Sequence, residues 1–384
     1  MNEHKQIYMY IMKALKGEEL SVQETRQVWN FIWDYFPKMG KWRPLYLLYN
    51  IFHLRRRIIS VLSASAVSMI FGLKPTVNVL AGLYLSFKDH NWLGEENIKH
   101  LTNAVSSEGW GGEEIPTINV GTPSAIIAAS VGVKVVKSGS RTFFSVSGFS
   151  DFLSSTSIPK TTELKVAEKL LQTYGLSLIE GEAFAPGTEL IVDTISTKAP
   201  EDIRLIFRGL TYPLRYAFIL MNPLRTVYAH RALGLPFTEV TTEALKNIHP
   251  YLKRVVCVFG RDISGRILDE VSTVGPTKVT LFDGNSTRTF TIMPEDLDLP
   301  LRKTEEIIPK SKEEGYKVIM EVLEGKRTKG DPYAELLAAN VSSILCAAGK
   351  TEDLKEGVEI AFNAIEDGKP AELLKKYSLF FEKS

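Results

Sequence analysis

Hydrophobic residues recur at helical spacing along the first hundred residues, so residues 5–104 predict helices almost throughout. Ser21 precedes one of these helices, and Glu24 follows it by three positions, a spacing typical of a capping box. The large apolar side chains of this helix share one face, which we interpret as core or dimer packing rather than a cofactor site: Trp29, Phe31, Ile32, Trp33 and Phe36.

The pattern changes after residue 104. Residues 105–120 have the glycine and polar content of a loop. Thr122 is predicted to cap the next helix, with Pro123 at its first helical position. A further helix is predicted to start within residues 147–153, capped by a hydroxyl group.

Short apolar runs then predict buried strands at residues 133–137, 176–179 and 254–260. They alternate with helices, of which the one at residues 165–175 is predicted to end at Gly175. This alternation favours a largely parallel sheet covered by helices.

The last third of the chain combines a hairpin with helices. Two alternating runs in residues 277–293 flank an Asp-Gly pair, which predicts an antiparallel hairpin. From residue 311 the chain is predicted to be helical, with Gly349 and Gly368 as stops.

We therefore expect an α/β protein of two domains. A small all-helical domain is expected over residues 1–104, joined by a later helical segment around residues 200–235. A larger α/β domain is expected over residues 105–384, with a mostly parallel central sheet and C-terminal helices.

Charge and composition narrow the function. The 46 Lys and Arg and the 45 Asp and Glu leave a formal net charge of +1, so no global field attracts nucleic acid, and we expect none as a partner. The most apolar stretch, residues 58–87, is interrupted by Lys74-Pro75 and predicts buried helices rather than a membrane span. Cys257 and Cys346 lack neighbours at metal-ligand spacing, so we expect reduced, buried thiols in a cytoplasmic protein.

Two segments have the composition of phosphate-binding loops. Glycine at Gly109, Gly111 and Gly112 allows backbone N–H groups to approach an anion closely. Asn119 and Thr122 lie at a predicted helix N-terminus, where free N–H groups favour phosphate. An ordinary glycine turn and a plain helix cap are the alternatives.

Two further segments carry charge. The segment KSGSR (137–141) combines Lys137, the last residue of a predicted buried strand, with a predicted turn at residues 138–141. Two cations there suit a pyrophosphate or simply make an exposed basic turn. Asp269 and Glu270 lie on a loop after another strand. Adjacent carboxylates there suit Mg²⁺ bridging a diphosphate, or form an ordinary acidic pair.

In this order the segments resemble the anthranilate phosphoribosyltransferase family, which shares its fold with the pyrimidine nucleoside phosphorylases. The chain matches the family motif GTGGD with GWGGE (109–113), NxST with NVGT (119–122) and KHGNR with KSGSR (137–141). It matches SSKSGSADVLEALG with SVSGFSDFL (145–153), and the DE pair followed by LTGPT with DE (269–270) followed by STVGPTKV (272–279). Residues 14–24 and 334–370 resemble the first and closing helices of the family.

The resemblance implies an enzyme that transfers phosphoribose from phosphoribosyl pyrophosphate to an aromatic amine and releases pyrophosphate, in tryptophan biosynthesis and as a homodimer. It implies Mg²⁺ ligation by Asp269 and Glu270. The implied diphosphate- and ribose-binding residues are Gly109, Gly111, Gly112, Asn119, Thr122, Lys137 and Ser147. The implied acceptor-side residues are Ser138, Ser140 and Arg208.

The chain departs from the family motifs on both sides of the site. On the diphosphate side, Trp110 replaces Thr, Glu113 replaces Asp, and Gly121 replaces a Ser that ligates metal in the family. On the acceptor side, Ser138 and Ser140 replace His and Asn. An acceptor other than anthranilate, or lost catalysis, fits these changes.

Three alternatives stay open. A phosphorylase would use inorganic phosphate to cleave a nucleoside or nucleotide. A non-catalytic relative would bind nucleic acid through a local basic cluster formed by Lys253, Arg254, Arg261, Arg266 and Lys278. A regulatory subunit would use the aromatic N-terminal helices as a contact surface.

Overall fold

The computed structural model describes residues 3–35, 75–90, 100–111, 113–140, 148–183 and 215–382. Its contacts divide the chain into two compact units. The first comprises Met1–Gly94, Phe184–Met221 and Glu243–Ile248, and the second comprises Glu95–Ala183, Asn222–Thr242 and His249–Ser384. Residue 104, the boundary expected from the sequence, lies within the strand at Thr102–Gly109.

The described helices of the first unit are α1 (Glu3–Leu15), α2 (Val22–Tyr35) and α5 (Val77–Asp89). The predicted capping box is confirmed, because Glu24 N donates to Ser21 Oγ and Ser21 N donates to the Glu24 carboxylate. Helical structure to residue 104 is wrong at its end, where a strand begins at Thr102.

The contact between α2 and α5 depends on a glycine. A Cβ atom at Gly82 would lie 2.6 Å from Cβ of Thr25, so only glycine permits this approach. Trp29 is 1% exposed and packs inside its own unit, so it is a core residue and offers no contact surface for dimerisation.

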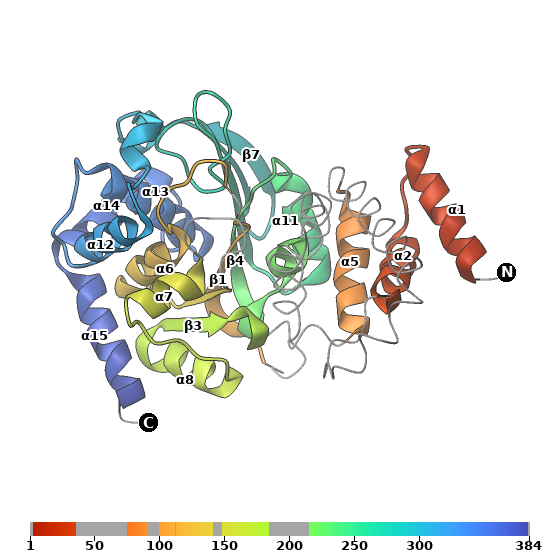
Figure 1. Ribbon diagram of the computed structural model, residues 1–384, viewed down its shortest axis with the longest axis horizontal. Coiled ribbons are helices and arrows are strands. Elements are labelled where there is room, and N and C mark those ends of the chain that lie inside the picture. Colours follow the sequence, from red (N-terminus) through yellow and green to blue (C-terminus); the bar gives the residue numbers. More distant parts are fainter. Residues whose placement is uncertain are drawn as a thin grey trace, which may run out of the picture. The chain divides into compact units, whose positions relative to one another are not determined.

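The second unit is built on a seven-stranded sheet of order β3-β2-β1-β4-β5-β6-β7. The strands are β1 (Thr102–Gly109), β2 (Val135–Gly139), β3 (Leu176–Glu180), β4 (Thr226–Ala232), β5 (Arg254–Gly260), β6 (Thr277–Phe282) and β7 (Thr287–Ile292). The first five in this order pair in parallel, and β6 and β7 pair antiparallel as the predicted hairpin. The predicted α/β fold with a mostly parallel sheet is confirmed (Figure 1).

Helices surround this sheet. They are α6 (Gly121–Ser130), α7 (Phe149–Ser155), α8 (Leu164–Tyr174), α11 (Thr238–Ile248), α12 (Lys312–Leu323), α13 (Pro332–Ala347), α14 (Leu354–Glu366) and α15 (Lys369–Glu382). Short 3-10 turns lie at η2 (Gly181–Ala183), η3 (Pro223–Arg225), η4 (Pro294–Leu297) and η5 (Thr304–Ile307). Helices α6 and α13 pack on each other and on the central strands, and their many alanines keep this contact close (Figure 1).

The predicted helix ends are mostly confirmed. Gly175 caps α8 in a left-handed conformation at φ 71°, and Gly349 and Gly368 follow the ends of α13 and α14 with φ values of 68° and 67°. Glycine adopts this conformation at little steric cost. The C-terminal part is helical from α12 onward, as its pattern predicts.

Three local predictions are wrong. Ser138 and Gly139 form the end of β2 rather than a turn, because they pair in register with β3. The N-cap of α6 is Val120 rather than Thr122, since the helix already begins at Gly121. The N-cap of α7 is Gly148, which offers no hydroxyl group.

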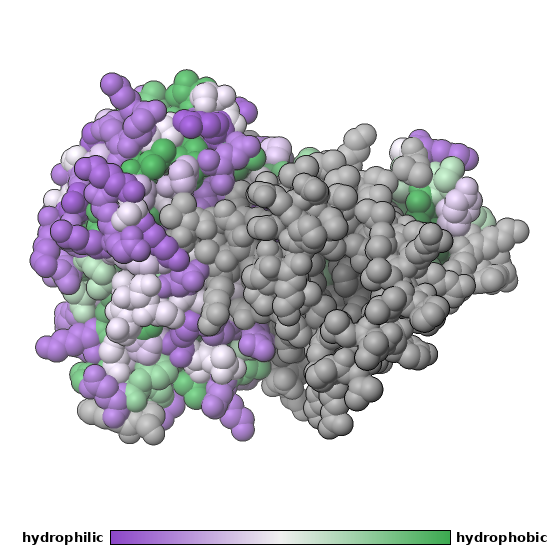
Figure 2. Space-filling model, viewed as in Figure 1, coloured by the Kyte–Doolittle hydropathy of each residue, from purple (hydrophilic) through white to green (hydrophobic). Residues whose placement is uncertain are grey.

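Hydrophilic side chains dominate the described surface over the C-terminal helices at the left of the view (Figure 2). Within the described residues, no helix combines the length and the apolar character needed to cross a membrane. Cys257 and Cys346 are free and buried, as predicted.

Candidate active site

Three of the charged or glycine-rich segments meet at Gly121, the first residue of α6. A Cβ atom at Gly121 would lie 3.5 Å from Cε of Lys137 on β2 and 3.7 Å from Oε1 of Glu270 on the loop after β5. Segments far apart in the sequence are thus brought together at the carboxyl ends of parallel strands, the usual place of ligand sites in such sheets.

The glycine-rich loop leaves β1 at its carboxyl end. Among the described residues, no heavy atom lies within 4 Å of a Cβ position at Gly109 or Gly111, and Gly111 has a φ of 65°. Open space therefore borders this backbone, as anion binding by its N–H groups requires. Gly112 lies outside the described residues.

Trp110, the bulky residue of this loop, is 6% exposed. Its backbone N–H donates to the carbonyl oxygen of Ala232 at 2.9 Å. A Cβ atom at Gly234 would lie 2.3 Å from Cδ1 of Trp110, so the indole lies directly on this glycine. Trp110 thus anchors the loop to the segment after β4.

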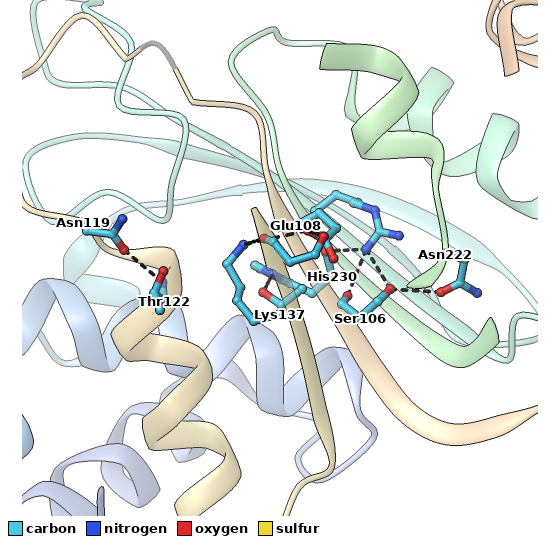
Figure 3. Close-up of polar contacts among 10 residues, drawn as sticks. Ser106, Glu108, Asn119, Thr122, Lys137, Asn222 and His230 are labelled. Atoms are coloured by element: carbon cyan, nitrogen blue, oxygen red, sulfur yellow. Dashed lines mark hydrogen bonds and ion pairs between the residues drawn. The ribbon is translucent and has the colours of Figure 1, made fainter. Parts of the chain in front are cut away.

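Asn119 and Thr122 lie at the start of α6. The side-chain oxygen of Asn119 accepts a hydrogen bond from the backbone N–H of Thr122 at 3.2 Å (Figure 3). This bond satisfies one of the free N–H groups of the helix N-terminus. Thr122 is 1% exposed.

Lys137 and Ser138 occupy the end of β2. Nζ of Lys137 lies 2.7 Å from the carbonyl oxygen of Ser138 and 3.8 Å from Oε2 of Glu108, and Oγ of Ser138 donates to the same Oε2 at 2.8 Å (Figure 3). Burial lowers the pKa of Lys137, against the attraction of the Glu108 and Glu270 carboxylates. Ser140 accepts a hydrogen bond at its carbonyl oxygen from the N–H of Ser150.

The acidic pair lies on the loop after β5. Asp269 is 4% exposed and adopts a φ of 63°, a strained value for a residue with a side chain. Burial raises the pKa of Glu270 to about 7; the charge of Lys137 lowers it and that of Glu113 raises it. The described part of the chain contains no group of three or more His, Cys, Asp or Glu residues arranged as a metal site.

Two residues position this loop. A Cβ atom at Gly260 would lie 2.0 Å from the carbonyl oxygen of Glu270, so the loop passes across the last residue of β5. The side-chain amide of Asn340 on α13 accepts from Val271 N at 2.8 Å and donates to Val271 O at 3.0 Å. The backbone next to Glu270 is therefore fixed from both the sheet and the helix.

A buried polar network on β1 and β4 was not predicted from the sequence. Nδ1 of His230 lies 3.0 Å from Oγ of Ser107, and Nε2 lies 2.9 Å from Oγ of Ser343. The Ser343 hydroxyl donates to Asn340 O, so it accepts from Nε2 of His230, and Nδ1 accepts from Ser107. Burial lowers the pKa of His230 to about 3, so the ring is neutral.

Arg231 on β4 completes the buried network. Arg231 is 0% exposed and donates to Ser106 O at 2.9 Å, to Ser106 Oγ at 3.0 Å and to His230 O at 2.8 Å. The Ser106 hydroxyl donates to the side chain of Asn222 (Figure 3). The sequence missed this network, because residues 105–120 were predicted to be a loop and the segment around residues 200–235 to be helical, whereas Thr102–Gly109 and Thr226–Ala232 form strands.

The structure brings together the glycine loop, the start of α6, the end of β2 and the acidic loop. Ser147 and Arg208, predicted to contact phosphate and the acceptor, lie outside the described residues.

The sequence profile described as "Glycosyl transferase family, a/b domain" matches residues 101–371. Among curated proteins, the chain is 33% identical over 268 residues to the anthranilate phosphoribosyltransferase of Psychromonas ingrahamii, covering 70% of this chain and 73% of that protein. It is 30% identical over 306 residues to the anthranilate phosphoribosyltransferase of Geobacillus kaustophilus, covering 79% of this chain and 83% of that protein.

Among solved structures, the anthranilate phosphoribosyltransferase from Saccharomyces cerevisiae in complex with PRPP and Mg superposes with a TM-score of 0.73. The match has 19% identity and covers 97% of this chain and 96% of that one. The enzyme from Thermus thermophilus gives a TM-score of 0.65 at 20% identity, covering 97% of this chain and 99% of that one. These matches support the fold described above.

Proposed function

Because the chain belongs to the anthranilate phosphoribosyltransferase family, we propose that it is a pentosyltransferase that moves phosphoribose from phosphoribosyl pyrophosphate to an aromatic amine, anthranilate or a related acceptor. Pyrophosphate is the second product. The observation that carries the proposal is the meeting of Gly121, Lys137 and Glu270 beside an open glycine loop.

The diphosphate side follows from this geometry. The open backbone at Gly109 and Gly111, continued by Gly112, would hold the diphosphate together with Lys137. Asn119 and Thr122 would hold phosphate and ribose at the start of α6, and Ser147 would add a phosphate contact.

Magnesium fits the charges of this site. Lys137 lies near the carboxylates of Glu108 and Glu270, and the carboxylate of Glu113 acts on Glu270, so an added diphosphate would meet several negative charges. Asp269 and Glu270 supply oxygen ligands, and diphosphate oxygens and water would supply the rest. Bound Mg²⁺ neutralises charge on the leaving pyrophosphate.

The acceptor would lie at Ser138 and Ser140, with Arg208 as a further contact.

The alternative functions fit the charges of the site less well. The carboxylates near Lys137 disfavour binding of free inorganic phosphate, which a phosphorylase needs. The cations considered for a nucleic-acid groove are largely paired, because Arg254 contacts Glu352, Arg266 contacts Asp262 and Lys278 contacts Glu239. We therefore propose a small-molecule enzyme with no nucleic-acid partner.

The domain organisation, the oligomeric state and the cellular location are proposed from the resemblance to the family. The two compact units would correspond to the small helical and the larger α/β domains. A homodimer in the cytoplasm, working in tryptophan biosynthesis, fits the two free thiols and the family.

Calorimetric titration with phosphoribosyl pyrophosphate, with and without Mg²⁺, tests this function. Binding that requires Mg²⁺ and is lost in the double variant Asp269→Ala/Glu270→Ala supports the proposal. No binding at millimolar ligand would overturn it, and a phosphate-plus-nucleoside assay would then test the phosphorylase alternative.

A further inference from the structure

Glu108 is a buried carboxylate next to the glycine loop with half of its hydrogen-bonding capacity unused. Oε2 accepts from Ser138 Oγ at 2.8 Å and lies 3.8 Å from Lys137 Nζ. Oε1 is buried and has no hydrogen-bond partner anywhere in the described part of the chain. An unpaired buried oxygen is costly, so it favours binding of a donor that the described residues do not supply.

The Glu108 carboxylate lies between the residues proposed for the two substrates, which its other oxygen, Oε2, contacts. Lys137 belongs to the proposed diphosphate side, whereas Ser138 belongs to the proposed acceptor side, and Glu108 contacts both. In phosphoribosyl transfer the reacting carbon lies between the leaving diphosphate and the attacking amine. The next residue, Gly109, borders open space.

The other ionisable groups of the site are already engaged. Both ring nitrogens of His230 are occupied by Ser107 and Ser343, so this ring has no free position for a substrate proton. Glu270 faces Lys137 and is a proposed metal ligand. Ser138 uses its hydroxyl hydrogen on Glu108.

We infer that Glu108 accepts the proton of the attacking amine, an inference that rests on the proposed function. The lone pair of the amine nitrogen forms a bond to the anomeric carbon, while the bond from that carbon to the diphosphate oxygen breaks and its electron pair leaves with pyrophosphate. The nitrogen, now positively charged, transfers one proton to Oε1 of Glu108. The products are the neutral N-phosphoribosyl amine, pyrophosphate and a protonated Glu108, which returns its proton to solvent.

The surroundings of Glu108 suit a base. Burial raises the pKa of its carboxyl group, opposed by the charges of Lys137 on β2 and Arg231 on β4 and by the hydrogen bond from Ser138. His230 on β4 is neutral, the charge of Glu270 acts on Lys137, and that of Glu113 acts on Glu270. A base works in its deprotonated form, so kcat rises with pH through the pKa of Glu108.

The test is the pH dependence of kcat in Glu108→Gln, which keeps the shape of the side chain and removes its basicity. We expect kcat to fall about 100-fold, with loss of the rise at acidic pH. Calorimetric affinity for phosphoribosyl pyrophosphate should stay within about threefold of the wild type. Formate added to Glu108→Ala should restore part of the rate, which a merely structural role would not produce.

Two variants complete the design. Glu163→Gln, at an exposed position before α8, is the matched control and should keep both kcat and its pH profile. If Glu108→Gln fails to fold, Glu108→Asp retains the carboxylate and should shift the acidic limb of the profile.

The outcomes separate this inference from the proposed function. An active wild type with an unchanged rate and profile in Glu108→Gln, or an unshifted limb in Glu108→Asp, overturns the role of Glu108 and leaves the transferase intact. A wild type that binds phosphoribosyl pyrophosphate but turns over no aromatic amine overturns both.

Discussion

Lys137 and Glu108 form a buried ion pair across the neighbouring parallel strands β2 and β1, with Nζ of Lys137 3.8 Å from Oε2 of Glu108. Removing one partner leaves the other charge uncompensated inside the protein. Lys137→Met should therefore lower the free energy of unfolding by about 3–5 kcal/mol, measured by urea denaturation.

The double variant Lys137→Met/Glu108→Gln should recover most of this loss, because no buried charge of the pair remains. Lys376→Met removes the exposed pair with Glu372 and should leave the free energy of unfolding nearly unchanged, because solvent screens this pair. A single variant at Lys137 as stable as the wild type would mean that the pair is not buried.

Gly260 should be essential for the position of the acidic loop. In Gly260→Ala the new Cβ atom would collide with the carbonyl oxygen of Glu270, so the loop must move. We expect a loss of about 1–3 kcal/mol in stability and about tenfold weaker binding of phosphoribosyl pyrophosphate in the presence of Mg²⁺, equal to about 1.4 kcal/mol.

Gly315→Ala on α12 is a matched control, since its Cβ atom would lie 3.4 Å from the nearest side-chain atom. It should leave affinity unchanged and raise stability by up to about 1 kcal/mol through helix propensity. Equal affinities in both variants would contradict the role assigned to Gly260.

Gly121 leaves room for the serine found in the family motif. A Cβ atom there would be in ordinary contact with Lys137 and Glu270, so Gly121→Ser should fold normally and place a hydroxyl group beside the proposed metal site. We expect Mg²⁺ to support phosphoribosyl pyrophosphate binding at a lower concentration, measured by titration of Mg²⁺ at fixed ligand. An unchanged Mg²⁺ requirement would argue against a metal at this position.

His230 should make the protein sensitive to acid. Its pKa is about 3 in the folded protein and about 6.5 when unfolded, so below pH 6.5 the unfolded state binds a proton that the folded state does not. Above pH 6.5 the ring is neutral in both states and the free energy of unfolding keeps its full value. As pH falls from 6.5 toward 3, proton binding by the unfolded state lowers the free energy of unfolding by up to about 1.4 kcal/mol per pH unit.

Urea denaturation from pH 7 to pH 4 measures this slope. His230→Gln should flatten it, whereas His100→Gln, at a side chain that is 60% exposed, should leave it as in the wild type. An identical slope in His230→Gln and the wild type would show that the ring is not held neutral.

The fold was predictable because its elements carry strong local patterns. Gly175, Gly349 and Gly368 mark helix ends through their backbone freedom, and the Asp-Gly pair marks the hairpin. The errors occur where long-range pairing decides. Ser138 and Gly139 look like turn residues, yet pairing with β3 makes them part of a strand.

The candidate site was predictable from motif order, but its charge environment was not. Nothing in the local sequence shows that Glu108 and Lys137 face each other, because strand register brings them together. The Ser107–His230–Ser343 contacts likewise join β1, β4 and α13, which are far apart in the chain.

The most direct test of the transferase is a steady-state assay of pyrophosphate release with phosphoribosyl pyrophosphate, anthranilate and Mg²⁺, followed by other aromatic amines. We predict release that requires the amine and the metal, together with a stoichiometric N-phosphoribosyl product. In Asp269→Ala/Glu270→Ala we expect a rate at least about 100-fold lower. Absence of turnover with anthranilate and with every other aromatic amine, under conditions in which the protein is folded, would contradict the account.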